Sequence, residues 1–242
     1  MISGWEQKYN DILKEFGYSK KQDLQAAKFL NSILKNSFPL KKLEQKIKNK
    51  TVFVIGAGPS LSLSIRSIKK FPNVTKIVAD GATQALLKNK IKPDIVVTDL
   101  DGDFESLKKA SEMNSIMVVH AHGDNITKLP YALKFRNCLG TTEARPFDKI
   151  KNFGGFTDGD RCVFLANHFG AKKIILFGMD FGNKIGSYSK QGRYDKQTKI
   201  KKLRRGRLLL EWLATKSNSE LYTTRPIKGF CQIRLRDLQE IL

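Results

Sequence analysis

Hydrophobic residues recur at helical spacing through the first fifty positions of the chain. Amphipathic helices are predicted over residues 5–16, 21–35 and 40–48. Charges of both signs occupy their polar faces, and we see no catalytic motif among them. We therefore expect residues 1–50 to form a helical N-terminal extension that packs against the rest of the chain.

The pattern changes at Thr51, where short β-branched runs of strand length begin to alternate with helical segments. Strands are predicted over residues 52–55, 74–79, 95–97, 116–120, 174–177 and 220–223, with weak signals at 137–139 and 152–153. Helices are predicted from residue 61 and over 82–89, 104–113, 160–169 and 203–216. Such alternation predicts an α/β domain over residues 51–242, with a Rossmann-like, mostly parallel sheet flanked by helices.

Composition narrows the class of protein. Of the 242 residues 40% are hydrophobic, and no apolar run approaches the length of a membrane span. The first residues lack the apolar core of a secretory signal. Cys138, Cys162 and Cys231 are far apart and form no C-x-x-C pair, which favours reduced thiols in a cytoplasmic protein over a disulfide frame or a zinc site.

The chain is strongly basic, with a formal net charge of +21. Residues 182–207 form a basic segment with ten Lys or Arg and one Asp. This excess is typical of nucleic-acid-binding proteins, and it would equally attract a polyphosphate ligand. No homeodomain, zinc-finger, RRM or KH signature accompanies it. Nucleic acid thus remains an alternative partner.

Against this basic background, Asp99, Asp101 and Asp103 follow the strand 95–97 at alternate positions. They would repel one another unless a cation lay between them. Mg²⁺ prefers such oxygen ligands, and it is often bound by carboxylates and substrate phosphates together. The alternative is an acidic loop in which Asp103 caps the next helix. Asp80, before Gly81, is either a further metal ligand or another helix cap.

Glycine or aspartate follows five predicted strands. In an open parallel sheet the carboxyl ends of the strands share one edge, where ligands bind. Any single case could be ordinary turn chemistry, but the coincidence predicts a site. The segments concerned are residues 56–60, Asp80, residues 99–103, residues 120–125 and Asp180.

The loop with Gly56, Gly58 and Ser60 opens a helix, so its amides could bind a phosphate. Neither a complete dinucleotide fingerprint nor a Walker A loop is present, and a tight turn capped by Ser60 is the alternative. The guanidinium groups of Arg145 and Arg161 suit phosphate oxygens, or they pair with neighbouring acids.

Two histidines, His120 and His122, alternate at the end of a predicted strand. They suit polar substrate contacts or a structural role better than a zinc site, which would want a third ligand. His168, within an apolar helix, is expected to be structural.

Six motifs resemble, in order, the archaeal 6-hydroxymethyl-7,8-dihydropterin pyrophosphokinase family, which is distantly similar to thiamine pyrophosphokinase. They are GAGPSL (56–61), DGA (80–82), PDIVVTDLDGD (93–103), HAHGDN (120–125), GFTDGDR (155–161) and GMDFG (178–182). Thr98 and Gly102 replace a glycine and a serine of the thiamine-type motif, which favours the pterin branch.

The resemblance implies Mg²⁺-dependent transfer of a diphosphate from ATP to the hydroxymethyl group of the pterin, with release of AMP. Asp99 and Asp101 would hold the metal, with help from Asp80. Contacts to ATP would come from Gly56, Gly58, Ser60, Asp80 and Gly81. Arg145, the catalytic candidate Arg161 or a lysine of residues 184–202 would neutralise the phosphate oxygens.

For the pterin, Asp124 or Asp158 would accept hydrogen bonds from the ring, with Asn125 and Thr157 nearby. Phe156 or Phe181 would stack on it. A homodimer is compatible with this reading. The alternative functions are thiamine pyrophosphokinase, a nucleotide-sugar glycosyltransferase that uses Asp-x-Asp, and a basic nucleic-acid-binding protein.

Overall fold

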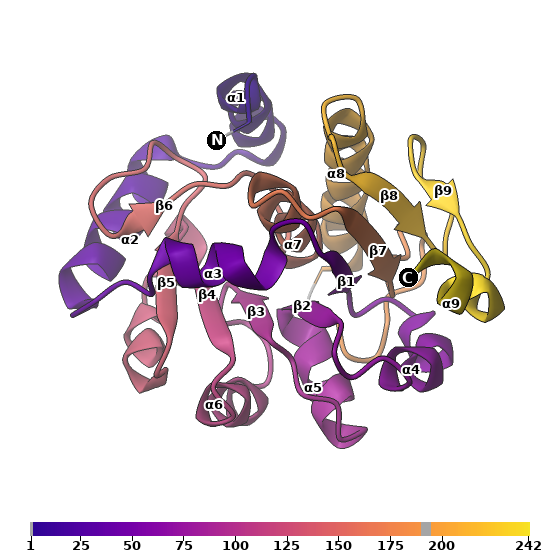
Figure 1. Ribbon diagram of the computed structural model, residues 1–242. Coiled ribbons are helices and arrows are strands. Elements are labelled where there is room, and N and C mark those ends of the chain that lie inside the picture. Colours follow the sequence, from indigo (N-terminus) through magenta and orange to yellow (C-terminus); the bar gives the residue numbers. More distant parts are fainter. Residues whose placement is uncertain (1, 190–194) are drawn as a thin grey trace.

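A computed structural model describes residues 2–189 and 195–242, in which one sheet of nine parallel strands forms the centre (Figure 1). The strand order is β6-β5-β4-β3-β2-β1-β7-β8-β9. The strands are β1 (Thr51–Ile55), β2 (Thr75–Ala79), β3 (Ile95–Thr98), β4 (Ile116–His120), β5 (Cys138–Thr141), β6 (Ile150–Lys151), β7 (Lys173–Phe177), β8 (Glu220–Thr223) and β9 (Cys231–Gln232). The predicted α/β fold with a parallel sheet is confirmed.

Helices cover both faces of the sheet. They are α1 (Trp5–Phe16), α2 (Lys20–Ile33), α3 (Leu40–Ile47), α4 (Leu61–Lys69), α5 (Asp80–Lys88), α6 (Phe104–Glu112), α7 (Asp158–His168), α8 (Lys196–Ala214) and α9 (Leu238–Ile241). Short 3₁₀ turns occur at η1 (Gly123–Asn125), η2 (Leu129–Lys134) and η3 (Leu235–Asp237). None of the helices in the described ranges is long and apolar enough to cross a membrane.

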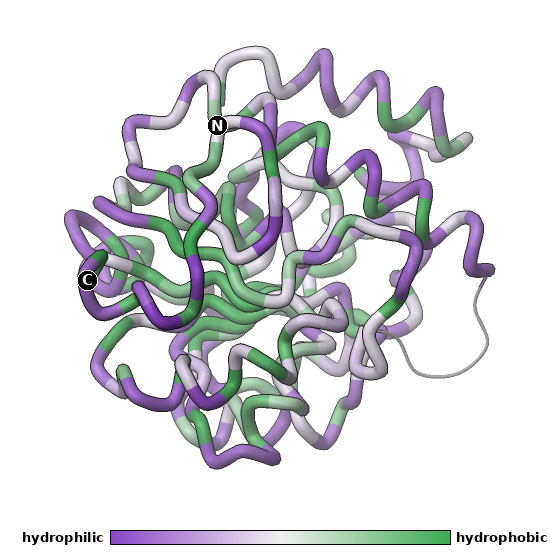
Figure 2. Tube along the Cα trace, turned by 90° about the vertical axis from the view of Figure 1, so that its right-hand side faces the viewer, coloured by the Kyte–Doolittle hydropathy of each residue, from purple (hydrophilic) through white to green (hydrophobic). Residues whose placement is uncertain are grey.

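Alternate residues of the central strands face the two layers, as the pleat of a strand requires. Val52 and Val54 of β1 are buried with α1, α3, α7 and α8, whereas Phe53 and Ile55 are buried with α4 and α5. Both faces of the strands are therefore apolar, and Figure 2 shows these green segments running through the middle of the molecule.

The N-terminal helices share this core. The hydrophobic cluster that contains Val52 and Val54 of β1 also takes in residues of α1 and α3. These residues, Trp5, Tyr9, Ile12 and Leu43, are almost completely buried. Helix α2 packs on the opposite face, against the layer that includes α6 and η2. The predicted extension thus contributes to the main hydrophobic core.

Some element boundaries differ from the prediction. Helix α8 begins at Lys196, seven residues earlier than expected, because Asp195 caps it: the carboxylate accepts hydrogen bonds from the amides of Gln197 (3.0 Å) and Thr198 (3.1 Å). The first turns of α8 are basic and lack apolar periodicity. Residues 190–194 of the basic segment lie outside the described residues.

Strand order determines where a ligand crevice can open. The chain runs outward from β1 through β2 to β6, and then returns to place β7 on the other side of β1. Connections leave the carboxyl ends of β1 and β7 in opposite directions. This is the topological switch point of an open α/β sheet, where ligands bind.

Candidate active site

Four carboxylates converge at the carboxyl edge of the sheet. One oxygen each of Asp80, Asp99, Asp101 and Asp158 lies within 4.8 Å of the others; we call these residues the acid cluster. Asp80 opens α5 after β2, Asp99 and Asp101 follow β3, and Asp158 opens α7. Asp103 stands outside the cluster and caps α6, since its carboxylate accepts a hydrogen bond from the amide of Ser106 (3.0 Å).

Asp80 is held by the turn that carries its neighbours. Its Oδ2 accepts hydrogen bonds from Thr98 Oγ1 (2.5 Å) and from the amide of Gly102 (3.2 Å). Leu100 adopts a left-handed conformation (φ 67°), and its amide donates to Thr98 Oγ1 at 2.8 Å. A Cβ at Gly102 would collide with Asp80 Oδ1. Thr98 and Gly102, where the chain departs from the thiamine-type motif, therefore position Asp80.

Electrostatic repulsion within the cluster is uneven. Burial and the charge of Asp99 raise the pKa of Asp80 to about 7, and the same two causes raise the pKa of Asp158. Burial opposes ionisation of Asp99 too, but His122 and Arg161 hold the pKa of Asp99 well below its usual range. His122 Nε2 lies 3.6 Å from Asp99 Oδ2. The cluster thus carries more negative charge than its own surroundings stabilise.

The acid cluster fits a divalent metal ion. Oδ1 of Asp80 and Oδ1 of Asp99 are buried, and neither has a hydrogen-bond partner within residues 2–189 or 195–242. Buried polar atoms without partners are rare in proteins and call for an explanation. Four carboxylates supply the hard oxygen ligands that Mg²⁺ prefers. A divalent cation would satisfy both buried oxygens and offset the repulsion between the acids.

Beside the cluster lies a buried network that begins at Arg161. Its Nη1 is 3.1 Å from Asp158 Oδ1, and its Nη2 donates to Glu143 Oε1 at 2.5 Å. His120 Nε2 is 3.3 Å from the other oxygen of Glu143. Burial opposes the charge on Arg161, but Glu143 and Asp158 raise the pKa of Arg161 above its usual value. Arg161 is therefore a fixed cation next to the acids.

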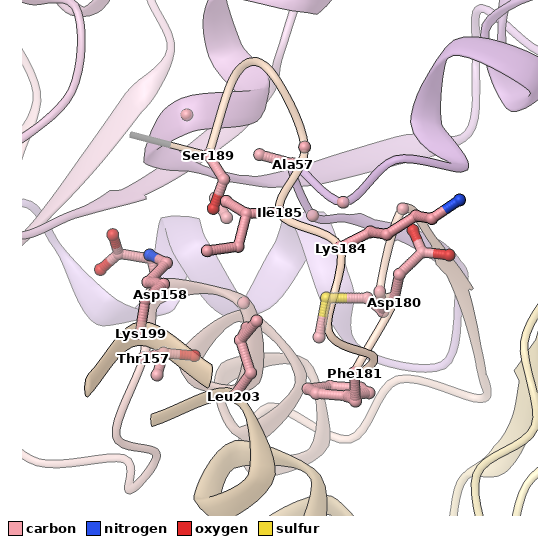
Figure 3. Close-up of a pocket in the computed structure, with 18 residues that line it drawn as sticks. Ala57, Thr157, Asp158, Asp180, Phe181, Lys184, Ile185, Ser189, Lys199 and Leu203 are labelled. Carbon is pink, nitrogen blue, oxygen red and sulfur yellow. The ribbon is translucent and has the colours of Figure 1, made fainter. Parts of the chain in front are cut away.

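A cavity that is partly open to solvent lies at the β1/β7 switch point. We call it the switch-point cavity. Figure 3 shows Asp158 and Lys199 on one side of it, and Asp180, Phe181 and Lys184 on the other. Its lining thus combines a carboxylate of the cluster, two lysines and an aromatic ring. Gly56, Gly58 and Gly81, predicted to contact ATP, also line it.

The amides of the β1–α4 loop require a correction. We expected them to bind an anion, but three of them donate hydrogen bonds inside the protein. The bonds join Gly56 N to Phe177 O (2.8 Å), Gly58 N to Gly178 O (2.8 Å) and Ser60 N to Asp180 Oδ2 (2.9 Å). A Cβ at Gly56 would lie 2.7 Å from the carbonyl oxygen of Gly178. The glycines therefore allow close packing of β1 on the segment after β7.

A second, smaller cavity opens on the other side of the cluster, and we call it the N-terminal cavity. Tyr18, between α1 and α2, and Gln22 and Asp23 of α2 line it together with Asp99 and Arg161. Sequence reasoning assigned no catalytic or binding role to residues 1–50. Their contribution follows from tertiary packing, because α2 lies against η1 at the end of β4.

The predicted substrate residues fall in different places. Asp124 is exposed and lines the N-terminal cavity. Asn125 is buried, and its side-chain amide donates to the backbone oxygens of Asp99 and His120, both at 2.7 Å. Its geometry therefore suits the positioning of Asp99 better than substrate contact. Thr157 lines the switch-point cavity, but its hydroxyl is bonded to the buried Asp160 at the start of α7.

Three further predictions concern Arg145 and the two phenylalanines. Arg145 is exposed on the segment after β5 and is not among the residues that line either cavity. The structure therefore does not bring it to the site. Phe156 lines the N-terminal cavity and Phe181 the switch-point cavity, so the two candidate stacking rings lie at different subsites.

Comparison with known proteins places this site in a family. Residues 25–186 match the family described as 6-hydroxymethylpterin diphosphokinase MptE-like. The chain belongs to this family. Three curated relatives are named 6-hydroxymethyl-7,8-dihydropterin pyrophosphokinase. The relative from Pyrococcus furiosus is 45% identical, over 90% of this chain and 96% of the relative. The relative from Methanocaldococcus jannaschii is 44% identical, over 89% of this chain and 97% of the relative. The relative from Methanothermobacter thermautotrophicus is 41% identical, over 78% of this chain and 82% of the relative.

Among solved structures, the MptE-like chain is similar to the MAf glycosyltransferase from Magnetospirillum magneticum AMB-1. The TM-score is 0.56 at 14% identity, and the match covers 78% of this chain and 34% of that one. The MptE-like chain thus spans about a third of the glycosyltransferase. At this identity the similarity concerns the fold alone.

The segment that matches the MptE-like family contains the whole acid cluster, together with Arg161 and Glu143. Glu143 has a clear place in the site, yet sequence reasoning missed it, because β5 was only a weak strand signal. An acid four positions beyond the weak strand signal at 137–139 was the available clue. Asp23, on α2, had no comparable signal in the sequence.

Proposed function

We propose that this MptE-like protein transfers a diphosphoryl group from ATP to the hydroxymethyl group of 6-hydroxymethyl-7,8-dihydropterin and releases AMP. One observation carries the proposal: the acid cluster reaches two separate cavities, since Asp158 lines the switch-point cavity and Asp99 lines the N-terminal cavity. A two-substrate transfer needs a donor and an acceptor on either side of one charge-neutralising centre. The names of the relatives support the pterin as acceptor.

The four residues of the acid cluster would hold Mg²⁺. This revises Asp158, which we first considered as a pterin contact, because its carboxylate lies with the other three. Mg²⁺ held there would offset the negative charge of the triphosphate and of the β-phosphoryl group during transfer. Asp80 and Asp99 contribute the two buried oxygens that have no hydrogen-bond partner in the part of the chain that the structure describes.

ATP would occupy the switch-point cavity. This is the larger of the two cavities, and it lies where open α/β sheets bind nucleotides. Lys184 and Lys199 supply positive charge for phosphate oxygens, whereas Phe181 and Leu203 supply apolar surface for a purine ring. The basic segment would thus attract the triphosphate.

In the reaction the hydroxyl oxygen of the pterin attacks the β-phosphorus, the bond to the oxygen that bridges the α and β phosphates breaks, and AMP leaves while the hydroxyl proton is released. The chain positions the two substrates in line and neutralises charge. Arg161 stays charged next to Asp158 because Glu143 holds its guanidinium. Asn125 fixes the backbone of Asp99.

The test is product analysis with MgATP and either the pterin or thiamine. We expect AMP and the diphosphorylated pterin; ADP as product, or no turnover with the pterin, would contradict the proposal. Asp101→Asn should lower kcat by about 100-fold or more, since it removes part of the metal-binding charge. Asp103→Asn is the matched control, because Asn also caps helices well and Asp103 lies outside the cluster.

A further inference from the structure

We propose that the N-terminal helices form the acceptor subsite, and that Asp23 recognises the edge of the pterin ring that carries the 2-amino group and N3–H. This inference rests on the proposed function. Asp23 lies in the first turn of α2 and lines the same cavity as Asp99 of the acid cluster. A ring held at Asp23 would thus share a cavity with the proposed metal site.

Two donors among the described residues bond to the Asp23 carboxylate, which leaves part of its acceptor capacity unused there. The residue is buried, with a relative exposure of 5%. Its Oδ2 accepts a hydrogen bond from the hydroxyl of Tyr9 (2.6 Å), and its Oδ1 accepts one from the amide of Gly123 (2.8 Å). A carboxylate accepts about four hydrogen bonds in all. Two neighbouring N–H donors of one ligand edge match the remaining capacity in a bidentate manner.

This carboxylate is also held rigidly. Helix α2 approaches η1 so closely that a Cβ at Gly123 would lie 2.8 Å from the Cβ of Gln22. Tyr9 on α1 and Gly123 on η1 bond to the two oxygens of Asp23 from different sides. A preorganised acceptor loses little entropy when a ligand binds. The packing of α1 and α2 on the sheet therefore serves recognition as well as stability.

The rest of the cavity suits a flat, polar heterocycle. Tyr18 and Phe156 line it with ring centroids 6.3 Å apart, and the ammonium group of Lys202 lies within 5.8 Å of both centroids. Arg161 also lines the cavity, and its buried Nε has no hydrogen-bond partner among the described residues. Aromatic walls with a few well-placed polar groups are the features of a small-molecule pocket.

Asp124 was the earlier candidate for this role and lines the same cavity. It is exposed, so water competes for its carboxylate and a ligand hydrogen bond there adds little affinity. Asp23 is buried, and a ligand that presents an acceptor instead of matching donors would face the carboxylate with unfavourable electrostatics. We therefore expect Asp23, more than Asp124, to distinguish the pterin from ligands that lack its two N–H donors.

The experiment compares binding of 6-hydroxymethylpterin and 6-hydroxymethyllumazine by calorimetry, without ATP or metal. The lumazine carries a carbonyl oxygen in place of the 2-amino group, so it presents an acceptor to the Asp23 carboxylate. We expect the wild type to bind the pterin about 10- to 100-fold more tightly. Asp23→Asn should abolish or reverse this preference, because its amide donates to the lumazine carbonyl while its oxygen accepts from N3–H.

Tyr9→Phe is the matched control. It removes a hydrogen bond to Asp23 but leaves the carboxylate, and Tyr9 is not among the residues that line the cavity. If Asp23 only ties α1, α2 and η1 together, both variants will keep the wild-type preference for the pterin, and the inference is wrong. If only Asp23→Asn loses the preference, it is supported.

Failure of the proposed function gives a different result. In that case the wild type does not bind 6-hydroxymethylpterin, and it releases no AMP when 6-hydroxymethyl-7,8-dihydropterin is added to MgATP. A wild type that releases AMP, with an Asp23→Asn variant that keeps the pterin preference, overturns only the assignment of Asp23.

Discussion

Asp80→Asn should stabilise the metal-free protein and abolish its metal response. Asn keeps the size of Asp80, and its carbonyl oxygen can still accept from Thr98 and Gly102. The pKa of Asp80 is raised from 3.8 to about 7 by burial and the charge of Asp99. Between these pH values the folded protein holds a proton that the unfolded chain has released. Ionised Asp80 therefore lowers the free energy of unfolding, by on the order of 4 kcal/mol above pH 7.

The assay is urea denaturation followed by circular dichroism, with EDTA present, at pH 4, 6 and 8. Because the folded pKa of Asp80 is raised, the stability that its protonated form provides is complete below pH 4 and is lost as the pH rises through 7. Asn does not ionise. We expect wild type and variant to have similar free energies of unfolding at pH 4, and the variant to gain up to about 4 kcal/mol at pH 8.

Saturating Mg²⁺ at pH 8 completes the experiment. Mg²⁺ at a free concentration of about 100 times its Kd should stabilise the wild type by about 3 kcal/mol and the variant hardly at all. A variant that is less stable than the wild type at pH 8, or a difference that does not change with pH, would refute the reasoning. Either result would mean that the burial of Asp80 carries no electrostatic cost, and that the acid cluster does not need a cation.

Three further predictions concern residues around the cluster. Glu143→Gln should lower the free energy of unfolding by about 3–5 kcal/mol in urea denaturation, since it removes one of the two carboxylates that pair with the buried Arg161. Gly81→Ala should raise KM for ATP by on the order of tenfold in steady-state kinetics, because its Cβ would collide with the carbonyl oxygen of Tyr188 on the segment that covers the switch-point cavity. Burial and the charge of Arg161 lower the pKa of His120 from 6.5 to about 4, so the unfolded chain takes up a proton before the folded protein does. The free energy of unfolding should therefore fall by about 3 kcal/mol as the pH drops from 6.5 to 4. In acid titrations of unfolding, His120→Gln should show a smaller fall over that range.

Each of these has its own control. Gly182 belongs to the same segment, and no atom of the described residues lies within 4 Å of a Cβ added there. An equal rise in KM in the Gly182→Ala variant would therefore contradict the steric explanation. Unchanged stability of Glu143→Gln would show that Arg161 does not depend on the buried ion pair. An acid loss of the same size in His120→Gln would assign it to other groups.

Much of the site was predictable because strand ends are readable from hydrophobic pattern. The runs before Asp80 and Asp99 are β-branched, and parallel strands must place these acids on one edge. The same reasoning could not separate the acids by role. Asp103 caps a helix and Asp158 joins the cluster because of where α6 and α7 begin, which depends on local capping rather than on hydrophobic spacing.

By itself the sequence determined the α/β class, the parallel sheet and the edge at which its acids gather, since these follow from local periodicity and the direction of strands. Only the tertiary structure decided which partners meet across the chain. In the folded chain the amides of the β1–α4 loop donate hydrogen bonds to the end of β7 and the residues after it, and Asp23 lines the same cavity as Asp99. Arg145 is not among the residues that line either cavity. Such contacts join residues far apart in sequence, and no local pattern encodes them.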